Sequence, residues 1–252
     1  MRDSVVGALD LDRTALFLDV DGTLLEFAAS PQAAFAPEGL VSCLARAESA
    51  LGGALALVSG RTLNDLDRLF RPLRMRASGV HGAEMRFDPV APAVVDERAE
   101  ALPAAAWRRL NAILADFPGA FAENKRFSFA VHYRAAPSLA GPLRDALRLF
   151  AGDEAALDLE LIEGTLVYEI KGPGFDKGAA VRRFMARAPF AGRTPVFVGD
   201  DATDEAGFAA VASLGGIAYS VGRSSPVVAA AFADPAMVRG WLEDLAAQRV
   251  PT

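Results

Sequence analysis

The sequence predicts an α/β protein in which a parallel sheet is interrupted by a separate α+β insert. The chain has 252 residues, of which 52% are apolar and 23% charged, enough to bury one large core or two smaller ones. Strand-like apolar runs alternate with helical patterns in the first third and again after residue 175. Such alternation favours parallel strands joined by right-handed crossovers.

The alternating segments predict the elements of the core in chain order. The first part contains strands at 15–20, 54–58 and 76–80, with helices at 37–51 and 62–70. The last part contains helices at 176–187, 203–212 and 234–247, with strands at 195–199 and 216–221. Together these segments predict a three-layer Rossmann-like core with a parallel sheet.

The middle of the chain predicts a different architecture. Short strands at 84–95 are broken by prolines, and helices are expected at 103–116 and 138–150. A hairpin at 120–133 and two strands at 157–162 and 165–170, separated by Glu163-Gly164, complete an α+β insert. We therefore predict a core of residues 1–82 and 173–252 and an insert of 83–172, with hinges at Gly79–Gly82 and Lys171–Gly174.

Charge and composition exclude several classes of protein. The net charge of -6 argues against a nucleic-acid binder or a binder of anionic membranes, which need a positive face. The one cysteine, Cys43, permits no internal disulfide and is expected to fill core space. No run of ~18 apolar residues occurs, and the first twelve residues carry Arg2, Asp3, Asp10 and Asp12 with no long apolar run. We therefore predict neither a membrane span nor a signal peptide, and a cytoplasmic location.

The most informative segment is the first predicted strand, which ends in the residues Asp19-Val20-Asp21-Gly22-Thr23. Ligands of open α/β sheets bind at the carboxyl ends of the strands. A chain that turns at Gly22 can direct the two carboxylates differently at one reacting centre, so that one attacks and the other moves protons. For this pair alone, an Asp-Gly turn without function is an equally good interpretation.

Four segments in order together resemble the motifs of the haloacid dehalogenase-like hydrolases. They are the DVDGT run at 19–23, the strand and loop LALVSGR at 55–61, Lys177, and the strand and loop PVFVGDD at 195–201. The resemblance implies a phosphatase that passes through an aspartyl-phosphate and requires Mg²⁺. The insert between the second and third motifs implies a type-two cap, a domain that supplies substrate specificity.

The insert and the last motif also resemble a narrower group, the trehalose-6-phosphate phosphatases. The similar segments are GVHGAE at 79–84, ENKRFSFAVHYR at 123–134, EIK at 169–171 and GDDATDE at 199–205. The resemblance spans about residues 15–222. The chain departs from the group's usual pattern at Val20 and at Lys171-Gly172-Pro173.

The resemblance implies a Mg²⁺ site and a division of catalytic roles. Mg²⁺ would be held by Asp19, the Asp21 carbonyl and Asp200. Asp204 would be a further ligand or would orient one, and Asp201 would support the ligands rather than bind the metal directly. The metal would shield the Asp19 nucleophile from a phosphate dianion. Asp21 would protonate the departing sugar oxygen and then deprotonate the attacking water.

The remaining site residues would hold the phosphate and the sugar. Phosphate-binding residues would be Gly22, Thr23, Ser59, Gly60, Arg61 and Lys177. For Arg61, binding phosphate and clamping the loop after the second strand remain alternatives. His81 lies between glycines, which suggests an exposed backbone near a hinge, with a structural or a site role. The sugar contacts implied by the resemblance are Glu123, Lys125, His132 and Glu169.

The sequence thus predicts a phosphoric monoester hydrolase that converts trehalose 6-phosphate to trehalose and phosphate. Its partner is a small phosphorylated disaccharide, with functional coupling to a trehalose-phosphate synthase. One alternative is another sugar phosphatase, acting on sucrose 6-phosphate or mannosylglycerate phosphate. A second is a non-catalytic phosphosugar-binding module, against which the intact Asp19, Asp21, Lys177 and Asp200 speak.

Overall fold

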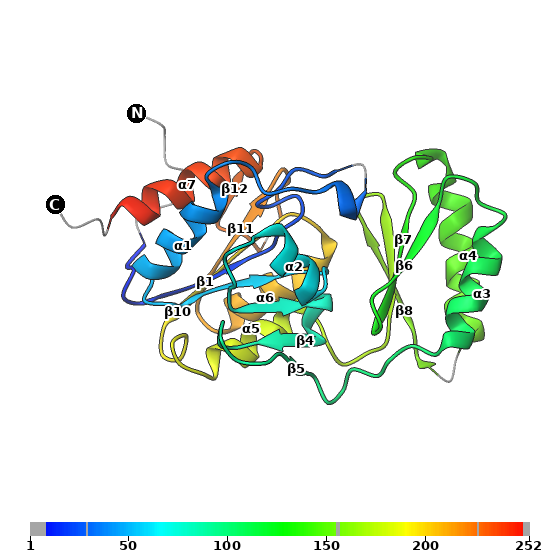
Figure 1. The fold of residues 1–252 in the computed structure, drawn as a ribbon, viewed down its shortest axis with the longest axis horizontal. Helices are drawn as coiled ribbons and strands as arrows, with labels where there is room; N and C mark the ends of the chain where they lie inside the picture. The colour runs from blue at the N-terminus through cyan, green and yellow to red at the C-terminus, as the bar shows by residue number, and fades with distance from the viewer. Residues whose placement is uncertain (1–8, 29, 155–156, 226, 249–252) are drawn as a thin grey trace. The chain divides into compact units, whose positions relative to one another are not determined.

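The computed structural model describes residues 9–28, 30–154, 157–225 and 227–248, and divides the chain into two compact units (Figure 1). The first unit, here called the core, comprises Met1–Ala28, Ala34–Val94 and Asp176–Thr252. The second, here called the cap, comprises Ala29–Ala33 and Val95–Phe175. The α/β class expected from the sequence is confirmed, since a large, mostly parallel sheet and an inserted antiparallel one are both present.

The core is built on an eight-stranded sheet in the order β12-β11-β10-β1-β2-β3-β4-β5. Neighbours from β12 to β3 are parallel, whereas β4 runs antiparallel to β3. The strands are β1 (Thr14–Leu18), β2 (Leu55–Val58), β3 (Ala77–Gly79), β4 (Glu84–Arg86), β5 (Val94–Val95), β10 (Thr194–Gly199), β11 (Ile217–Val221) and β12 (Ala230–Phe232).

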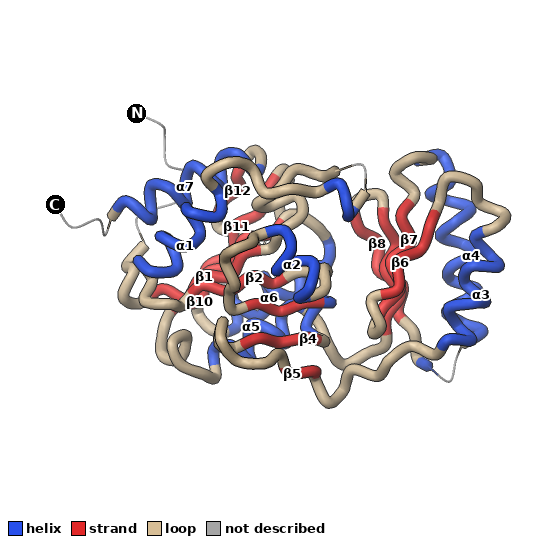
Figure 2. The backbone as a smooth tube through the Cα atoms, viewed as in Figure 1, coloured by secondary structure: helices blue, strands red, loops and turns tan. Residues whose placement is uncertain are grey.

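Helices cover both faces of this sheet, which gives three layers (Figure 2). Leu16 and Leu18 of β1 face helices α1 (Leu40–Ala50), α2 (Leu63–Leu69) and α7 (Pro235–Ala247). Ala15 and Phe17 face α5 (Lys177–Met185) and α6 (Glu205–Ser213). Because β1 is buried on both faces, its sequence is a continuous apolar run rather than an alternating one.

The cap is an antiparallel sheet with two helices on one face. The strand order is β6 (Phe121–Asn124), β7 (Ser128–His132), β9 (Val167–Lys171) and β8 (Glu160–Gly164). Helices α3 (Ala104–Leu114) and α4 (Ala140–Asp153) pack on Phe129, Val131, Tyr168 and Ile170. Side chains alternate along a strand, so the residues between these project from the other face, here called the open face.

The predicted domain boundary differs from the observed one. Residues 83–94 belong to the core rather than to the insert, because β4 pairs with β3 and extends the core sheet. The chain therefore leaves the core at Val94, and Gly79–Gly82 is not a hinge between the units. It returns after Phe175, directly beyond the predicted hinge at Lys171–Gly174.

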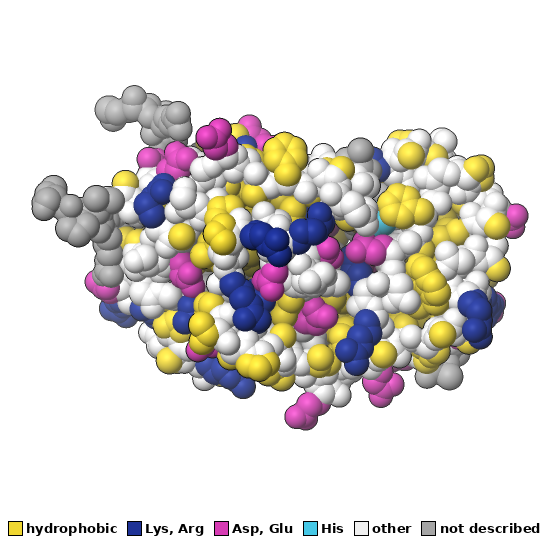
Figure 3. Space-filling model, in the orientation of Figure 1, with side chains coloured by type: hydrophobic (Ala, Val, Ile, Leu, Met, Phe, Trp, Pro, Cys, Tyr) yellow, Lys and Arg dark blue, Asp and Glu magenta, His cyan; other side chains and the backbone are white. Residues whose placement is uncertain are grey.

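Smaller differences concern where single elements begin and end. β1 stops at Leu18 rather than at residue 20, and β8 continues through Gly164, so the turn to β9 falls at Thr165 and Leu166. Leu166 has a left-handed φ of 60° there. Among the described residues, no helix is both long and apolar enough to cross a membrane. On the face drawn in Figure 3, acidic and basic side chains are interspersed.

Candidate active site

The first, second and fourth motifs of the core meet because their strands are neighbours. β1 lies between β10 and β2, and all three are parallel, so their carboxyl ends lie at one edge of the sheet. Asp19 follows β1, Ser59 follows β2, and Asp200 follows β10. Residues far apart in the chain are thus placed side by side where open α/β sheets bind ligands.

Three carboxylates form a buried cluster at this edge. Asp19, Asp200 and Asp204 each offer an oxygen, and these oxygens lie within 4.8 Å of one another. Lys177, the first residue of α5, donates to Asp19 Oδ1 at 2.8 Å and to Asp204 Oδ1 at 2.7 Å. Asp176 caps this helix by accepting from the Ala179 amide at 2.6 Å, which fixes where α5 begins and hence where Lys177 lies.

Burial and mutual repulsion shift the titration of the cluster. Burial raises the pKa of Asp19 well above its usual value, although Lys177 opposes the shift. Burial, followed by the charges of Asp204 and Asp201, raises the pKa of Asp200 to about 7. Burial disfavours the charge on Lys177, but Asp19 and Asp204 outweigh it and raise the pKa of the ammonium. The cluster carries more negative charge than one lysine balances, which is the situation a cation would relieve.

The remaining oxygen of Asp204 shapes the loop after β10. Its Oδ2 accepts from the amides of Asp200 at 3.0 Å and Asp201 at 3.1 Å. Asp201 in turn accepts from the Thr203 amide and hydroxyl, which completes a capping box. The structure therefore gathers Asp19, Asp200 and Asp204 of the five predicted metal residues, and turns the Asp201 carboxylate toward the next helical turn.

Gly22 and Thr23 support Asp200 rather than presenting free amides. A Cβ at Gly22 would lie 2.2 Å from Asp200 Oδ2, and the residue has a φ of 80°. The Thr23 hydroxyl donates to Asp200 Oδ1 at 3.2 Å. The amide of Gly22 donates to Leu25 O, and that of Thr23 to Val20 O, inside the turn. Both amides are thus engaged inside the turn, and the role of Gly22 and Thr23 in phosphate binding stays a prediction.

Arg61 contacts the second carboxylate of the DVD motif. Its Nε donates to Asp21 Oδ2 at 2.6 Å, and its Nη2 donates to Asp21 Oδ1 at 2.7 Å. This is the bidentate geometry in which arginine binds carboxylates most strongly. The sequence left open whether Arg61 binds phosphate or clamps the loop after β2, and both remain compatible with this contact to Asp21.

The loop after β2 is packed against His81. The Ser59 hydroxyl accepts from the Arg61 amide at 3.2 Å, and the Ser59 carbonyl accepts from the His81 amide at 3.0 Å. A Cβ at Gly60 would lie 2.6 Å from His81 Nε2, so only glycine fits beside the imidazole. His81 is buried and has a φ of 53°, contrary to the exposed position expected from its neighbouring glycines.

The predicted sugar residues of the cap lie together on its open face. Glu123 Oε2 is 3.1 Å from His132 Nε2, and Lys125 Nζ is 3.3 Å from Glu169 Oε2. Burial alone would raise the pKa of Glu123, but the hydrogen bond with His132 and the charge on Lys125 outweigh it and lower that pKa. The structure brings together all four residues, whose role in binding stays a prediction.

Two further residues join this group. The Ser128 hydroxyl donates to Glu169 Oε1 at 2.6 Å, an oxygen that also lies 3.5 Å from Lys125 Nζ. Phe121 stacks on His132 with ring centroids 4.8 Å apart and stays 42% exposed. Neither was among the predicted site residues, although Phe121 lies two residues before Glu123 and so shares its face of β6.

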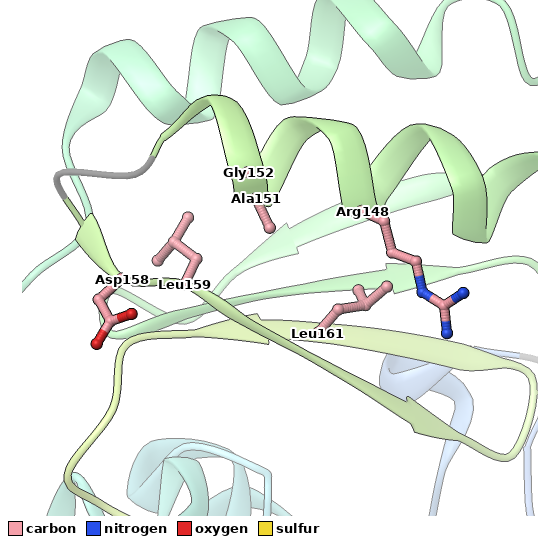
Figure 4. Close-up of a pocket in the computed structure, with 6 residues that line it drawn as sticks. All are labelled: Arg148, Ala151, Gly152, Asp158, Leu159 and Leu161. Carbon is pink, nitrogen blue, oxygen red and sulfur yellow. The ribbon is translucent and has the colours of Figure 1, made fainter.

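A separate hollow of about 400 Å³ lies on the helix-covered side of the cap sheet (Figure 4). It is lined by Arg148, Ala151, Gly152, Asp158, Leu159 and Leu161. Leu161 pairs with Ile170, which faces the helices, so this hollow lies across the sheet from the polar group of the open face. It contains none of the predicted site residues.

The core cluster has the ligand chemistry of a divalent cation site. Mg²⁺ is a hard cation that prefers oxygen ligands from one or two carboxylates and completes its shell with water and phosphate. Asp19 and Asp200 supply such oxygens, and Thr23 and Gly22 hold Asp200 in place. Lys177 occupies one side of the cluster as a fixed positive charge. The donor set therefore fits a divalent metal.

Comparisons with known proteins identify a family. The trehalose-phosphatase family profile matches residues 17–234. The chain is 40% identical over 231 residues to a trehalose-6-phosphate phosphatase of Escherichia coli (strain K12), covering 91% of this chain and 85% of that protein.

Solved structures share the fold. The C-terminal domain of the C. albicans trehalose-6-phosphate phosphatase is 22% identical, with a TM-score of 0.81 over 94% of this chain and 92% of that one. The C-terminal domain of a Candida albicans trehalose synthase regulatory protein is 13% identical, with a TM-score of 0.71 over 94% of each chain. From the family profile and the extent of identity, this chain belongs to the trehalose-phosphatase family.

Proposed function

We propose that the protein hydrolyses trehalose 6-phosphate to trehalose and inorganic phosphate in a Mg²⁺-dependent reaction. The observation that carries the proposal is the buried cluster of Asp19, Asp200 and Asp204 around Lys177, in a chain of the trehalose-phosphatase family. This cluster supplies a nucleophile, a metal site and a fixed cation within one group of contacts.

The Mg²⁺ ion would be held by Asp19 and Asp200, with the Asp21 carbonyl as a third protein ligand. When bound, the metal supplies positive charge that offsets the repulsion between a phosphate dianion and the Asp19 carboxylate. Lys177 adds a second positive charge, 2.8 Å from the nucleophile. Asp204 keeps this lysine and the Asp200 amide in place, so we assign it an orienting role.

The chemistry proceeds in two steps on Asp19. Its carboxylate oxygen attacks phosphorus while the bond from phosphorus to the sugar oxygen breaks, and Asp21 gives a proton to that oxygen. Asp21 then takes a proton from the water that attacks the aspartyl-phosphate, which releases phosphate and regenerates Asp19. Asp21 is partly exposed, and its contact with Arg61 defines its direction. Ser59 and Lys177 bind the phosphoryl oxygens in this scheme.

Recognition of the sugar would fall to the open face of the cap sheet. Glu123, Lys125 and Glu169 present charged groups that can bind paired hydroxyls, and their mutual contacts orient them before substrate arrives. A substrate without the matching hydroxyls would leave these groups unsatisfied, which is costly. This gives a physical basis for preferring a disaccharide phosphate over a simple ester.

The fold by itself does not decide between catalysis and binding, since a trehalose synthase regulatory protein has a similar one. The presence of Asp19, Asp21, Lys177 and Asp200 favours catalysis over a non-catalytic phosphosugar-binding module. We place the protein in the cytoplasm, because a charged sugar phosphate does not cross a bilayer unaided and must be hydrolysed where it is made. Coupling to a trehalose-phosphate synthase would follow from shared substrate.

A phosphate-release panel tests the proposal. The purified protein is assayed with trehalose 6-phosphate, sucrose 6-phosphate and glucose 6-phosphate, with Mg²⁺ and with a chelator. We expect release from trehalose 6-phosphate above all, and only with Mg²⁺. Faster release from sucrose 6-phosphate would support the alternative sugar phosphatase, and binding without any release would support the non-catalytic alternative.

A further inference from the structure

Arg223 binds the main chain of the loop that carries Asp200. Its Nε donates to the Asp200 carbonyl at 2.6 Å, and its Nη2 donates to the Asp201 carbonyl at 2.7 Å. The same Nη2 donates to Glu205 Oε1 at 2.6 Å, at the start of α6. One guanidinium thus joins both acidic residues of the loop to the helix that follows them.

Arg223 complements Asp204 on the same two residues. Asp204 Oδ2 accepts from the amides of Asp200 and Asp201, and Arg223 donates to their carbonyls. All four main-chain polar groups of this pair are therefore bound by side chains. Since the backbone dihedrals of Asp200 set the direction of its carboxylate, these contacts define where the metal ligand points.

The position of Arg223 is itself fixed by its surroundings. Gly222 has a φ of 69° and donates to the Phe232 carbonyl at 2.9 Å, so the chain turns sharply after β11. The Ser220 hydroxyl donates to the Arg223 carbonyl. The guanidinium lies 6.0 Å from the centre of the Phe208 ring. An arginine held in this way loses little conformational freedom when it binds the loop.

We propose that Arg223 is a positioning residue for the metal site, which holds the Asp200–Asp201 loop in the conformation that binds a divalent cation. The inference rests on the proposed function, and deepens it with a residue from the turn after β11, a segment that carries no sequence motif. Arg223 contacts none of the carboxylates of Asp19, Asp200 and Asp204, so it acts on the metal site through the main chain of the loop and through its contact with Glu205.

The test measures metal binding without turnover. Mg²⁺ is titrated into the substrate-free wild-type protein and into Arg223→Met and Arg223→Lys by calorimetry. We expect Arg223→Met to weaken Mg²⁺ binding by at least ~10-fold, as is usual when a residue that orients metal ligands is removed. Arg223→Lys should recover only part of the loss, because an ammonium lacks the planar fork that reaches both carbonyls. Activity of Arg223→Met should return at high Mg²⁺ concentration.

Arg193→Met is the matched control. Arg193 also binds main-chain carbonyls, those of Leu11, Thr14 and Leu51. These lie at the amino end of β1, whereas the cluster lies beyond its carboxyl end. Both variants should lower the melting temperature, and only Arg223→Met should change the affinity for Mg²⁺. Wild-type affinity in Arg223→Met, or an equal loss in Arg193→Met, would overturn the proposal. If the wild-type protein bound no Mg²⁺ and released no phosphate, the proposed function itself would be wrong.

Discussion

The guanidinium of Arg61 donates two hydrogen bonds, of 2.6 and 2.7 Å, to the carboxylate of Asp21. The arginine is 8% exposed, and its carbonyl accepts from the Val80 amide, so the segment after β3 holds the main chain of Arg61 in place. Asp21 follows β1, and 40 residues separate the two in the chain. The contact joins the predicted proton-transfer residue to the predicted phosphate loop.

Replacing Arg61 should therefore act on proton transfer. In Arg61→Met, Asp21 loses its orientation, and we expect kcat to fall by ~10² for trehalose 6-phosphate and for p-nitrophenyl phosphate alike. Inhibition by inorganic phosphate, measured in the same assay, should be nearly unchanged. A large loss of phosphate inhibition would instead show that Arg61 binds the phosphoryl group.

Asp19→Asn should fold normally and lose turnover. The amide has nearly the same volume but is not a nucleophile, and it removes one charge from the metal site. Circular dichroism checks the fold, and phosphate release checks the activity. If the variant retained a substantial fraction of wild-type activity, the aspartyl-phosphate mechanism would be wrong.

Gly22→Ala should damage the metal site through Asp200. The added Cβ would lie 2.2 Å from Asp200 Oδ2 and would push the carboxylate away. We expect loss of Mg²⁺ binding and of activity. Gly39→Ala is the control, because Gly39 has a similar φ of 82° and a Cβ there meets nothing within 4 Å. It should share the backbone strain but keep wild-type Mg²⁺ affinity, and a matching loss in both variants would rule out the steric explanation.

Metal stabilisation should depend on pH. In the metal-free protein, burial and neighbouring carboxylates raise the pKa of Asp200 to about 7. The folded protein then holds the Asp200 proton more tightly than the unfolded chain does. This proton therefore stabilises the folded state, and its contribution to the free energy of unfolding is complete below the unfolded pKa, about 4. It is lost as pH rises through the folded pKa.

Mg²⁺ competes with that proton, so it should raise the melting temperature more at about pH 8 than at about pH 6. In Asp200→Asn, the rise in melting temperature caused by Mg²⁺ should be nearly the same at both pH values. An equal Mg²⁺ effect at both pH values in the wild-type protein would contradict the assignment of Asp200.

Much of the fold could be predicted because the core strands are unusually clear in the sequence. β1, β2 and β10 are buried on both faces, so each is an uninterrupted apolar run. β12 was missed because three residues, Ala230–Phe232, are too short to show a period. β4 was assigned to the insert because a three-residue strand does not reveal which sheet it joins, and only its pairing with β3 places it in the core.

The candidate site was predictable where it follows strands and not where it depends on tertiary contacts. Asp19, Ser59 and Asp200 directly follow strands of a parallel sheet, so their meeting could be expected. The contact of Arg61 with Asp21 could not be predicted, because it depends on how the loops after β1 and β2 approach each other. Arg223 lies outside every recognised motif, and its role depends on carbonyl groups that the sequence does not distinguish.

In the proposed function, the core transfers the phosphoryl group and the open face of the cap binds the sugar. Glu123→Ala tests this division most directly, measured as kcat/KM for trehalose 6-phosphate and for p-nitrophenyl phosphate. Glu163→Ala is the control, since Glu163 is on the same sheet but pairs with Arg148 of α4.

We expect Glu123→Ala to lower kcat/KM for trehalose 6-phosphate by at least ~10-fold and to change that for the small ester no more than a few-fold. Glu163→Ala should leave both values close to wild type. Equal losses on both substrates in Glu123→Ala, or no loss on either, would contradict the assignment of sugar recognition to the open face of the cap.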